Sequence, residues 1–468
     1  MQTLRKEIQT NQGQSIVVAK FGGTSMADEV AMRRSAQVSM QRNASIVVVS
    51  ATAGTTNQLL EVAKNAIESK EAQTNLLIDK IKARHLELAH KLEVADQTLE
   101  QLNGLFEELE TLAKGILLLR DCWPKTRDGL VSLGERMSSL LFSECMSQLY
   151  SSQNETLKSV ELLDVREVLA TDDRHERARP NFNKIEILCQ QHLTAKLPST
   201  VFVTQGFMGR GPSGATTTLG RGGSDYSAAI LAWGVDADVL EIWTDVPGIA
   251  TTDPRICPSA QIISEISFQE AAELATFGAK ILHPTTLAPA GQKNIPVFVG
   301  SSYDPDKGGT WIVSQIEDEK TPLVRALAMR KDQTLLTITT PKMLQTHGFL
   351  YQIFKIFNDY QVSIDAITTS EISVALTLDK TDASNDELLE ELKRYADISL
   401  EHDLELVSLI GNRINHTPGL GEKIFNCLGD INVRMICHGA SRHNFCFIVK
   451  KDQGAEAISR LHNGFITN

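Results

Sequence analysis

The sequence predicts an α/β protein in which a domain built on a parallel sheet precedes two copies of a smaller, ferredoxin-like module. The first observation is a pair of strand–loop–helix units, over residues 16–40 and from residue 45 onward. Such units in succession favour a right-handed parallel sheet. The second observation is an internal repeat, with an offset of 71 residues, in the C-terminal part of the chain. A chain of 468 residues can form several domains, each with its own core.

Composition and charge narrow the possible functions. The net charge of −12 argues against a general surface for nucleic acid or for an anionic membrane. No segment reaches the ~18 uninterrupted apolar residues that a membrane span needs, so we expect neither kind of partner. The seven cysteines are scattered without a C-x-x-C pair, which is typical of free thiols in a reducing compartment and unlike a zinc site. The sequence therefore predicts a cytoplasmic protein without a metal site of its own.

The first strand ends in a loop suited to phosphate. A β-branched run over 16–19 is followed by Lys20, Gly22 and Gly23, and then by helical periodicity over 26–40. In open parallel sheets, ligands bind at the carboxyl ends of the strands, beside helix N-termini. Glycines let backbone N–H groups approach a ligand closely, and Lys20 adds a mobile positive charge. The loop lacks the Walker pattern, and a plain turn is the alternative interpretation.

The next segments carry hydroxyl groups and one carboxylate of interest. A strand over 45–50 runs into a small, hydroxyl-rich loop at 51–57. The region that follows has helical composition, and we expect its charges over 61–114 on solvated helix faces. Glu135 precedes an apolar helical run, so from the residues alone we interpret it as a first-turn carboxylate that complements the helix dipole. We expect residues 172–175 in a solvated loop.

A second glycine-rich loop indicates an anion site. Residues 209–214 match G-x-G-x-x-G by letter, but no helix follows them, so we interpret them as a hairpin turn. Residues 216–225 then open the next helix, with Ser224 or Asp225 as its expected N-cap. Arg221 lies among three glycines of this loop. Its guanidinium group offers a planar fork to a carboxylate or a phosphate.

The remainder of the first domain supplies two further cations. Strands over 239–243 and 295–299 complete the predicted sheet, and we expect the second of them to close it. Between them, Arg255 lies in a turn, and Lys280 ends a helix. From the residues alone, Lys280 is a C-terminal cation that interacts favourably with the helix dipole.

The repeated modules each show the order strand, helix, strand, strand, helix, which is typical of a ferredoxin-like unit. The two copies differ in charge. Asp365 and Glu371 of the first copy correspond to Ile436 and Arg442 of the second. We therefore expect the first module to hold a small cationic or zwitterionic effector and the second to serve mainly in packing. The alternative is that Asp365 and Glu371 only face solvent.

Together these segments resemble the aspartokinase family, and within it the monofunctional, lysine-sensitive class. The resemblance spans roughly residues 15–465 and rests on four motifs in the family's order, at 20–25, 219–226, 243–248 and 277–280. It implies an amino-acid-kinase-type catalytic domain on a parallel sheet, followed by two ferredoxin-like ACT regulatory domains of βαββαβ topology. The implied boundaries are a polar extension at 1–14, the catalytic domain at 15–320, the first ACT domain at 321–400 and the second at 401–468, with which a strand near 324–331 pairs.

The resemblance also implies a reaction, in which Mg²⁺-ATP phosphorylates the β-carboxylate of L-aspartate on the route to lysine, threonine and methionine. The substrate carboxylate itself attacks, so the protein supplies positioning and charge neutralisation. By similarity, Lys20 neutralises the transferring phosphoryl group, and Asp225 orients Lys20 and Arg221. Glu135 then binds the α-ammonium group of aspartate and Arg221 its α-carboxylate, which replaces the helix-dipole interpretation of Glu135. The remaining implied contacts are Ser50 and Thr56 for aspartate, and Gly22, Gly23, Thr244, Asp245, Arg255 and Lys280 for the nucleotide.

Feedback inhibition by L-lysine is implied as well, and ACT domains of this family pair across subunits, so we expect a homodimer or a dimer of dimers. One departure is Ala250, where the family usually has a tyrosine near the nucleotide. Two alternatives differ in class: another amino-acid-kinase-type enzyme, acting on glutamate, carbamate or a nucleoside monophosphate, and a catalytically silent ACT amino-acid sensor. The implied lysine-binding residues are Met343, Phe349, Leu350, Ser363, Ile364, Asp365, Thr369, Ser370 and Glu371.

Overall fold

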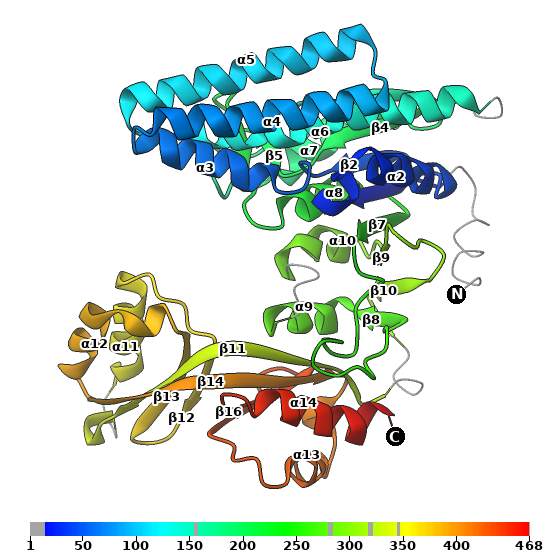
Figure 1. Ribbon diagram of the computed structural model, residues 1–468. Helices are drawn as coiled ribbons and strands as arrows, with labels where there is room; N and C mark the ends of the chain where they lie inside the picture. Colours follow the sequence, from blue (N-terminus) through cyan, green and yellow to red (C-terminus); the bar gives the residue numbers. More distant parts are fainter. Residues whose placement is uncertain (1–14, 154–157, 279–283, 317–321, 344–346, 468) are drawn as a thin grey trace. The chain divides into compact units, whose positions relative to one another are not determined.

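A computed structural model gives the fold of two compact units (Figure 1). The first unit contains residues up to Ile249 together with 264–268 and 282–315, and the second contains 250–263, 269–281 and 316–468. The chain therefore passes between the units several times. The structure describes residues 15–153, 158–278, 284–316, 322–343 and 347–467.

The first unit is built on a sheet that has eight strands in its described part, in the order β3-β4-β2-β1-β7-β9-β10-β8. Neighbouring strands are parallel, except that β10 runs antiparallel to β9. The strands are β1 (Val17–Phe21), β2 (Ile46–Val49), β3 (Ser159–Leu163), β4 (Thr200–Gln205), β7 (Val239–Thr244), β8 (Glu265–Ser267), β9 (Val297–Ser301) and β10 (Gly309–Val313).

The prediction that the strand near 295–299 closes this sheet is wrong. After β9 the chain turns back as β10, in which Thr310 and Ile312 are buried while the alternate residues are half-buried. Such alternation is typical of a strand with one covered face. Gly309 permits the close approach of β10 to β9, because a Cβ there would lie 2.3 Å from the carbonyl oxygen of Val299.

The central strand β1 positions the first loop of interest. All five of its residues are buried, as are the four of β2, which is typical of parallel strands covered on both faces. Lys20 lies in register with Val48 of β2 on one side and Ile242 of β7 on the other. The three strands therefore end at the same edge of the sheet, and their loops emerge side by side.

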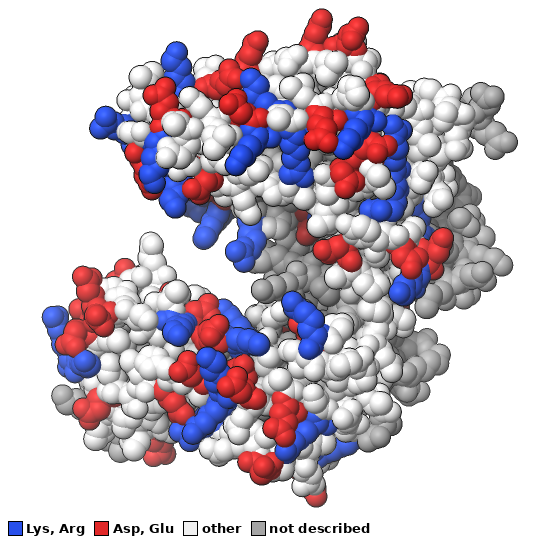
Figure 2. Space-filling view, viewed as in Figure 1, with Lys and Arg blue, Asp and Glu red and all other residues white. Residues whose placement is uncertain are grey.

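Helices cover the sheet, and four long ones, α3 to α6, lie together as a bundle (Figure 1). This confirms the helical prediction for the region after residue 58. On the face in Figure 2, acidic and basic side chains are interspersed over these helices. The helices of the first unit are α2 (Glu29–Gln41), α3 (Thr55–Ile67), α4 (Glu71–Leu92), α5 (Asp96–Leu119), α6 (Pro124–Ser152), α7 (Phe182–Cys189), α8 (Gly223–Gly234) and α10 (Ala288–Gln292).

The second unit contains an antiparallel sheet that has six described strands, in the order β12-β13-β11-β14-β16-β15. Its strands are β11 (Val324–Thr339), β12 (Ala366–Thr369), β13 (Ser373–Asp379), β14 (Asp397–Gly411), β15 (Met435–His438) and β16 (Asn444–Lys450). Its helices are α9 (Phe268–Thr276), which begins at the division between the units, α11 (Phe349–Asp359), α12 (Asp386–Lys393), α13 (Leu420–Leu428) and α14 (Gly454–His462).

The 71-residue repeat is reproduced in these elements, since β13 displaced by 71 residues coincides with β16. One strand of the second module comes from the sequence of the first. The first half of β11 pairs with the end of β14, so Val324 and Leu327 pack in the core beneath α13 and α14. Ile398 and Leu400, at the start of β14, pack against the core beneath α11 and α12. The second module is thus completed by the start of β11, whereas the first is completed by the start of β14, within its own sequence.

Candidate active site

Lys20 and Asp225 form an ion pair at the carboxyl edge of the parallel sheet. Lys20 Nζ lies 2.5 Å from Asp225 Oδ1, and both side chains are largely buried. Lys20 comes from the end of β1 and Asp225 from the first turn of α8. The backbone N–H of Gly22 donates to the carbonyl oxygen of Trp243 in β7 at 3.2 Å. The loop of Lys20, Gly22 and Gly23, called here the phosphate-type loop, is therefore fixed between the end of a strand and the N-terminus of a helix.

The loops after β1 and β2 lie against each other. A Cβ at Gly23 would lie 3.2 Å from the carbonyl oxygen of Ala51, so glycine permits the close approach. The backbone N–H of Ser50 donates to the carbonyl oxygen of Phe21 at 3.2 Å. Gly54, at φ +82°, then turns the chain into α3. The two loops thereby form one continuous wall.

Glu135 supplies a buried carboxylate without a complete set of partners. Its side chain is 3% exposed, and in the described part of the molecule its Oε2 has no hydrogen-bond partner. Burial raises the pKa of this carboxyl to about 8, against the opposing effect of the Ala51 backbone N–H. The first-turn interpretation of Glu135 is wrong, because α6 already begins at Pro124. Gly134 lets the helix approach, since a Cβ there would lie 2.9 Å from Ala51 Cβ.

Arg221 lies on a turn that two left-handed glycines create. Gly220 and Gly222 adopt φ +80° and +72°, which glycine alone adopts readily. Because Gly222 takes the N-cap position, α8 begins at Gly223, and the prediction of Ser224 or Asp225 as N-cap is wrong. The hairpin of β5 (Met208–Arg210) and β6 (Thr216–Thr218) that leads into this turn confirms the interpretation of residues 209–214.

These loops enclose a pocket of about 390 Å³ in the first unit. It brings together seven of the residues that the sequence singled out, from four separate segments: Lys20, Gly23, Ser50, Thr56, Glu135, Arg221 and Asp225. The remaining lining residues are Ala51, Thr52, Ala53, Gly54, Asn57, Phe207, Gly220, Gly222, Gly223 and Ser224. A lysine, an arginine, two carboxylates and glycine backbone are the groups that a zwitterion and a polyphosphate require.

Three other described residues expected to contact a nucleotide, Thr244, Asp245 and Arg255, are not among the residues that line this pocket. Thr244 and Asp245 follow the end of β7, where Thr244 Oγ1 donates to Asp245 Oδ1 at 3.2 Å. Arg255 belongs to the second unit and pairs with Asp253 at 2.7 Å. Lys280 lies outside the described residues. The nucleotide contacts of Arg255 and Lys280 therefore stay predictions.

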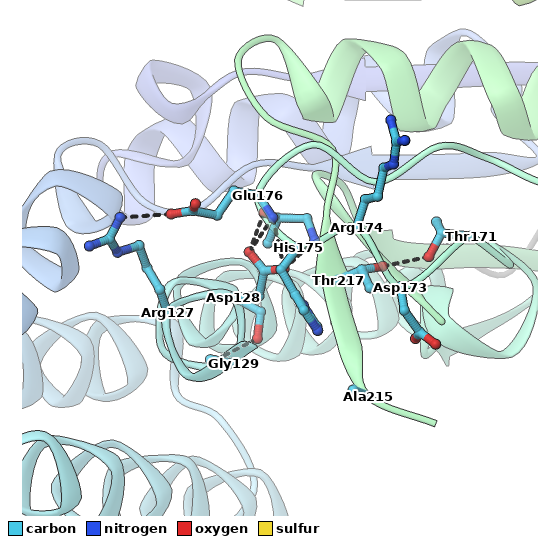
Figure 3. Close-up of polar contacts among 12 residues, drawn as sticks. Arg127, Asp128, Gly129, Thr171, Asp173, Arg174, His175, Glu176, Ala215 and Thr217 are labelled. Atoms are coloured by element: carbon cyan, nitrogen blue, oxygen red, sulfur yellow. Dashed lines mark hydrogen bonds and ion pairs between the residues drawn. The ribbon is translucent and has the colours of Figure 1, made fainter. Parts of the chain in front are cut away.

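Sequence reasoning missed Asp128, which organises the loop that contains His175 and Glu176 (Figure 3). The Asp128 side chain is 1% exposed and accepts a hydrogen bond from His175 Nδ1 at 2.8 Å. It also accepts from the backbone N–H of Glu176 at 3.1 Å, and from Thr218 Oγ1 at 2.6 Å and Thr218 N at 3.1 Å. The expectation of a fully solvated loop is wrong for His175, because this buried carboxylate holds it. No local pattern around Asp128 indicates the contact, which arises only when α6 meets β6.

The loop that Asp128 holds borders a wide depression of about 830 Å³. A Cβ at Gly220 would lie 3.1 Å from the carbonyl oxygen of Glu176, and the backbone N–H of Ala178 donates to the carbonyl oxygen of Thr218 at 2.9 Å. The loop therefore packs directly against the turn that carries Arg221. The depression is lined by Pro124, Asp173, Arg174, His175, Glu176, Arg177 and Arg179.

In the first ACT-like module, Asp365 is already engaged. Its Oδ1 lies 2.7 Å from Arg330 Nη1, and Arg330 Nη2 lies 2.9 Å from Asp379 Oδ2. Burial nonetheless raises the pKa of Asp365 above its usual value, against the opposing effect of Arg330. Ser370 Oγ lies within hydrogen-bond distance, 2.7 Å, of Ser373 Oγ in the turn between β12 and β13.

The other predicted effector residues surround the start of α11 and the end of β12. Phe349 is buried at the beginning of α11, Leu350 beside it is exposed, and Met343 and Ile364 pack on the same core cluster as Phe349. Three more are exposed or lie in exposed turns of this module: Ser363, Thr369 and Glu371.

A search of the described residues finds no group of three or more His, Cys, Asp or Glu side chains arranged to hold a metal ion. None of the described helices is both long enough and apolar enough to cross a membrane. The seven cysteines are free thiols.

Comparison with known proteins gives consistent matches. Residues 15–301 match the amino acid kinase family, and residues 407–465 match an ACT domain. Lysine-sensitive aspartokinase 3 of Escherichia coli K12 is 44% identical over 456 residues, which is 96% of this chain and 98% of that protein. The structure of E. coli aspartokinase III with aspartate and ADP, in the R-state, superimposes with a TM-score of 0.83 at 43% identity, over 97% of this chain and 100% of that one. The same enzyme with lysine and aspartate, in the T-state, gives a TM-score of 0.82 at 43% identity and the same coverage.

Proposed function

The chain belongs to the amino acid kinase family and, within it, to the aspartokinases, and from this premise we propose how its residues carry out the reaction. The enzyme transfers the γ-phosphoryl group of ATP to the β-carboxylate of L-aspartate. A carboxylate oxygen attacks the γ-phosphorus, and the bond to the bridging oxygen of ADP breaks. No proton has to move, because the β-carboxylate is already ionised. The protein therefore has to hold two anions together and neutralise their charge.

The observation that carries this assignment is a buried acid and an arginine in the same pocket. Glu135 presents a buried carboxyl oxygen that has no partner among the described residues, and Arg221 lines the same pocket from the opposite loop. A free amino acid carries an ammonium group and a carboxylate on one carbon. Its ammonium group completes the environment of Glu135, and its α-carboxylate takes the fork of Arg221. Ser50 and Thr56 border the bound aspartate, which leaves the β-carboxylate directed at Lys20.

Lys20 and Asp225 act on the phosphoryl group. Asp225 neutralises Lys20, so the ammonium group is held in place before ATP binds. On binding, Lys20 stabilises the charge that develops on the transferring oxygens, and the Gly22 and Gly23 amides lie beside it. Mg²⁺ would be carried by the nucleotide, would keep several of its waters and would supply further charge neutralisation at the phosphates.

Regulation and assembly complete the proposal. L-lysine inhibits by binding the first ACT module, near Asp365 and the start of α11, and favours an inactive arrangement. The solved T-state of the E. coli enzyme with lysine and aspartate supports this assignment by similarity. We further propose a homodimer, or a dimer of dimers, formed through the ACT modules, and a cytoplasmic location in keeping with seven free thiols.

A coupled assay of ADP release tests the function. We expect release with aspartate, and little with glutamate, carbamate or a nucleoside monophosphate. Arg221→Lys keeps the charge but loses the bidentate fork, so the KM for aspartate should rise by about tenfold or more. ADP release that does not depend on aspartate would overturn the assignment, and a complete lack of turnover with intact lysine binding would favour a silent sensor.

A further inference from the structure

Two consecutive residues of α4, Arg84 and His85, reach out of the helical bundle to the loops that line the pocket. The sequence predicts solvated faces for this region, yet Arg84 is half-buried and His85 is fully buried. His85 lies on the apolar stripe that Ile78, Ile81 and Leu88 form. A polar residue in such an apolar stripe is the one sequence signal that could have indicated the burial of His85.

Arg84 joins the two loops by their backbones. Its Nη1 donates to the carbonyl oxygen of Ala53, and its Nη2 donates to the carbonyl oxygen of Ala27 at 3.0 Å. Ala53 belongs to the pocket-lining loop after β2. Ala27 caps the 3₁₀ turn η1 (Gly23–Met26), which begins at the second glycine of the phosphate-type loop. A single planar guanidinium group therefore spans from the nucleotide side of the pocket to the aspartate side.

His85 fixes the second loop through a hydroxyl group. Its Nδ1 lies 2.7 Å from the carbonyl oxygen of Ile81, which can only accept, so Nδ1 carries the hydrogen. Nε2 is then an acceptor and lies 3.2 Å from Thr52 Oγ1, which in turn lies 2.6 Å from Thr55 Oγ1. Burial lowers the pKa of His85 to about 4, so this neutral form persists at physiological pH. These hydrogen bonds from His85 to Thr55 hold the loop at Thr52, which lines the pocket.

We propose that Arg84 and His85 are positioning residues that set the separation between the phosphate loop after β1 and the aspartate loop after β2. They touch neither substrate and act only through Ala27, Thr52 and Ala53. The inference rests on the proposed function, because it assumes that the two loops hold the donor and the acceptor of one phosphoryl transfer. In that case a small change in their separation affects the transfer far more than it affects the binding of either substrate alone.

The first test compares Arg84→Gln with Lys80→Gln, a matched control at an exposed position of the same helix. Since a displacement of about 1 Å can reduce a rate roughly hundredfold, we expect kcat of Arg84→Gln to fall by at least about tenfold. Binding of aspartate alone, and of a non-hydrolysable ATP analogue alone, should stay within about threefold of the parent enzyme by calorimetry. Arg84→Lys should be intermediate, because an ammonium group cannot hold both carbonyl oxygens in a fixed fork.

Several results would overturn the proposal. The first is a kcat of Arg84→Gln equal to that of Lys80→Gln. The second is a change confined to the affinity for one substrate. The third is a fall in activity that matches a smaller fraction of folded protein, measured as the binding stoichiometry. The last result would assign Arg84 a purely structural role. If the parent enzyme itself lacked aspartate-dependent ADP release, the proposed function would fail first. An active parent with a fully active Arg84→Gln variant would refute the positioning role alone.

The second test is a double-mutant cycle between His85 and Thr52. His85→Leu and Thr52→Val each remove one end of the same hydrogen bond, so the double variant should be no slower than the slower single variant. His85→Gln can donate to Ile81 and accept from Thr52, and should recover most of the activity that His85→Leu loses. Effects of His85→Leu and Thr52→Val that multiply independently, or a failure of His85→Gln to improve on His85→Leu, would contradict the proposal.

Discussion

Two regions of this molecule are proposed to bind a free amino acid, and they treat its charges in opposite ways. In the pocket of the first unit, the buried Glu135 keeps a carboxylate oxygen without a partner. In the first ACT module, Asp365 already pairs with Arg330 at 2.7 Å, and the two side chains are only 18% and 30% exposed. A site with unpaired charges gains its ion pairs when the ligand binds. A site with paired charges binds only by exchanging one partner for another.

The difference indicates what each site is built for. The catalytic pocket is preorganised, so little rearrangement is needed before the transfer, but the empty protein has to keep a carboxyl whose pKa is raised to about 8. In the proposed effector site, Asp365 already has Arg330 as a partner. Lysine would have to compete with Arg330 for Asp365, which would couple its binding to a local rearrangement. Only differential binding of this kind can shift an equilibrium between two states.

The largest effect is expected at the unpaired charge of the pocket. Glu135→Gln keeps the volume of the side chain but removes the partner of the substrate ammonium group. Removing one member of a buried charge pair costs about 3–5 kcal/mol, so kcat/KM for aspartate should fall by roughly two to four orders of magnitude. Steady-state kinetics checks this, with Glu107→Gln on the exposed face of α5 as the control. An unchanged KM for aspartate would show that Glu135 does not face the ammonium group.

The pH dependence of the stability of Glu135→Gln tests how much the buried carboxyl of Glu135 destabilises the parent protein. Between pH 4.5 and about 8 the unfolded chain has released the proton that folded Glu135 retains. The unfolded state then binds fewer protons, so the stability of the empty parent falls as pH rises through this window. The ligand-free Glu135→Gln variant should therefore have a higher Tm than the parent at pH 8, and the difference should shrink towards pH 5. The KM of the parent for aspartate should fall as pH rises from 6 to 8, because the ammonium group binds the ionised carboxylate.

The next largest effect is expected at the paired site and separates the two ACT modules. Asp365→Ala should raise the lysine concentration for half-inhibition by about tenfold or more, since it removes a charge-assisted contact. Ile436→Ala, at the corresponding position of the second module, should leave inhibition unchanged. Equal losses in both variants would refute the asymmetry between the modules.

Arg330→Gln sharpens the same prediction, because it removes the group that competes with lysine for Asp365. Half-inhibition should then require less lysine than in the parent enzyme, while kcat without lysine stays unchanged. A requirement for more lysine would show that Arg330 supports the site rather than competes for it.

A smaller effect is expected from the support behind the pocket. In Asp128→Asn an amide NH₂ group replaces one acceptor oxygen and faces N–H and O–H donors, so buried donors lose their partner. We expect a loss of stability of about 1–3 kcal/mol. We also expect a several-fold rise in the KM for aspartate, because Thr218 leads into the turn of Arg221. Thermal unfolding and kinetics of Asp128→Asn, compared with Asp121→Asn at an exposed position, separate the two effects. A lower Tm with an unchanged KM would limit Asp128 to a structural role.

The sequence predicts the centre of the pocket well because the centre depends on strand ends. Lys20, Ser50 and Asp225 each follow or face the carboxyl end of a parallel strand, and this topology brings such positions to one edge. The contacts by which the helices support the pocket loops could not be predicted in this way. Arg84 and Asp128 reach the loops only after α4 and α6 have packed, and no local period or spacing records such tertiary contacts.

The fold shows the same division between local and non-local information. The repeat predicts the order of elements in each module, because both copies carry the same short-range pattern. The pairing of the first half of β11 with the second module is set by how far two long strands extend past each other. The extension of the first sheet by β10 likewise depends on a pairing with β9 that no local pattern records.

The smallest effect is expected at the ion pair of the second module, in which a glutamate stands at the position of Arg330. With the offset of 71 residues, Glu401 corresponds to Arg330, and it pairs with Arg434 at 2.7 Å while both side chains are at least 30% exposed. Partly exposed pairs contribute about 0–1 kcal/mol. Arg434→Gln should therefore lower Tm only slightly and leave the half-inhibitory lysine concentration within about twofold. If Arg434→Gln weakened inhibition as strongly as Asp365→Ala, the second module would share in effector binding, and the contrast between a responsive and a packing module would have to be abandoned.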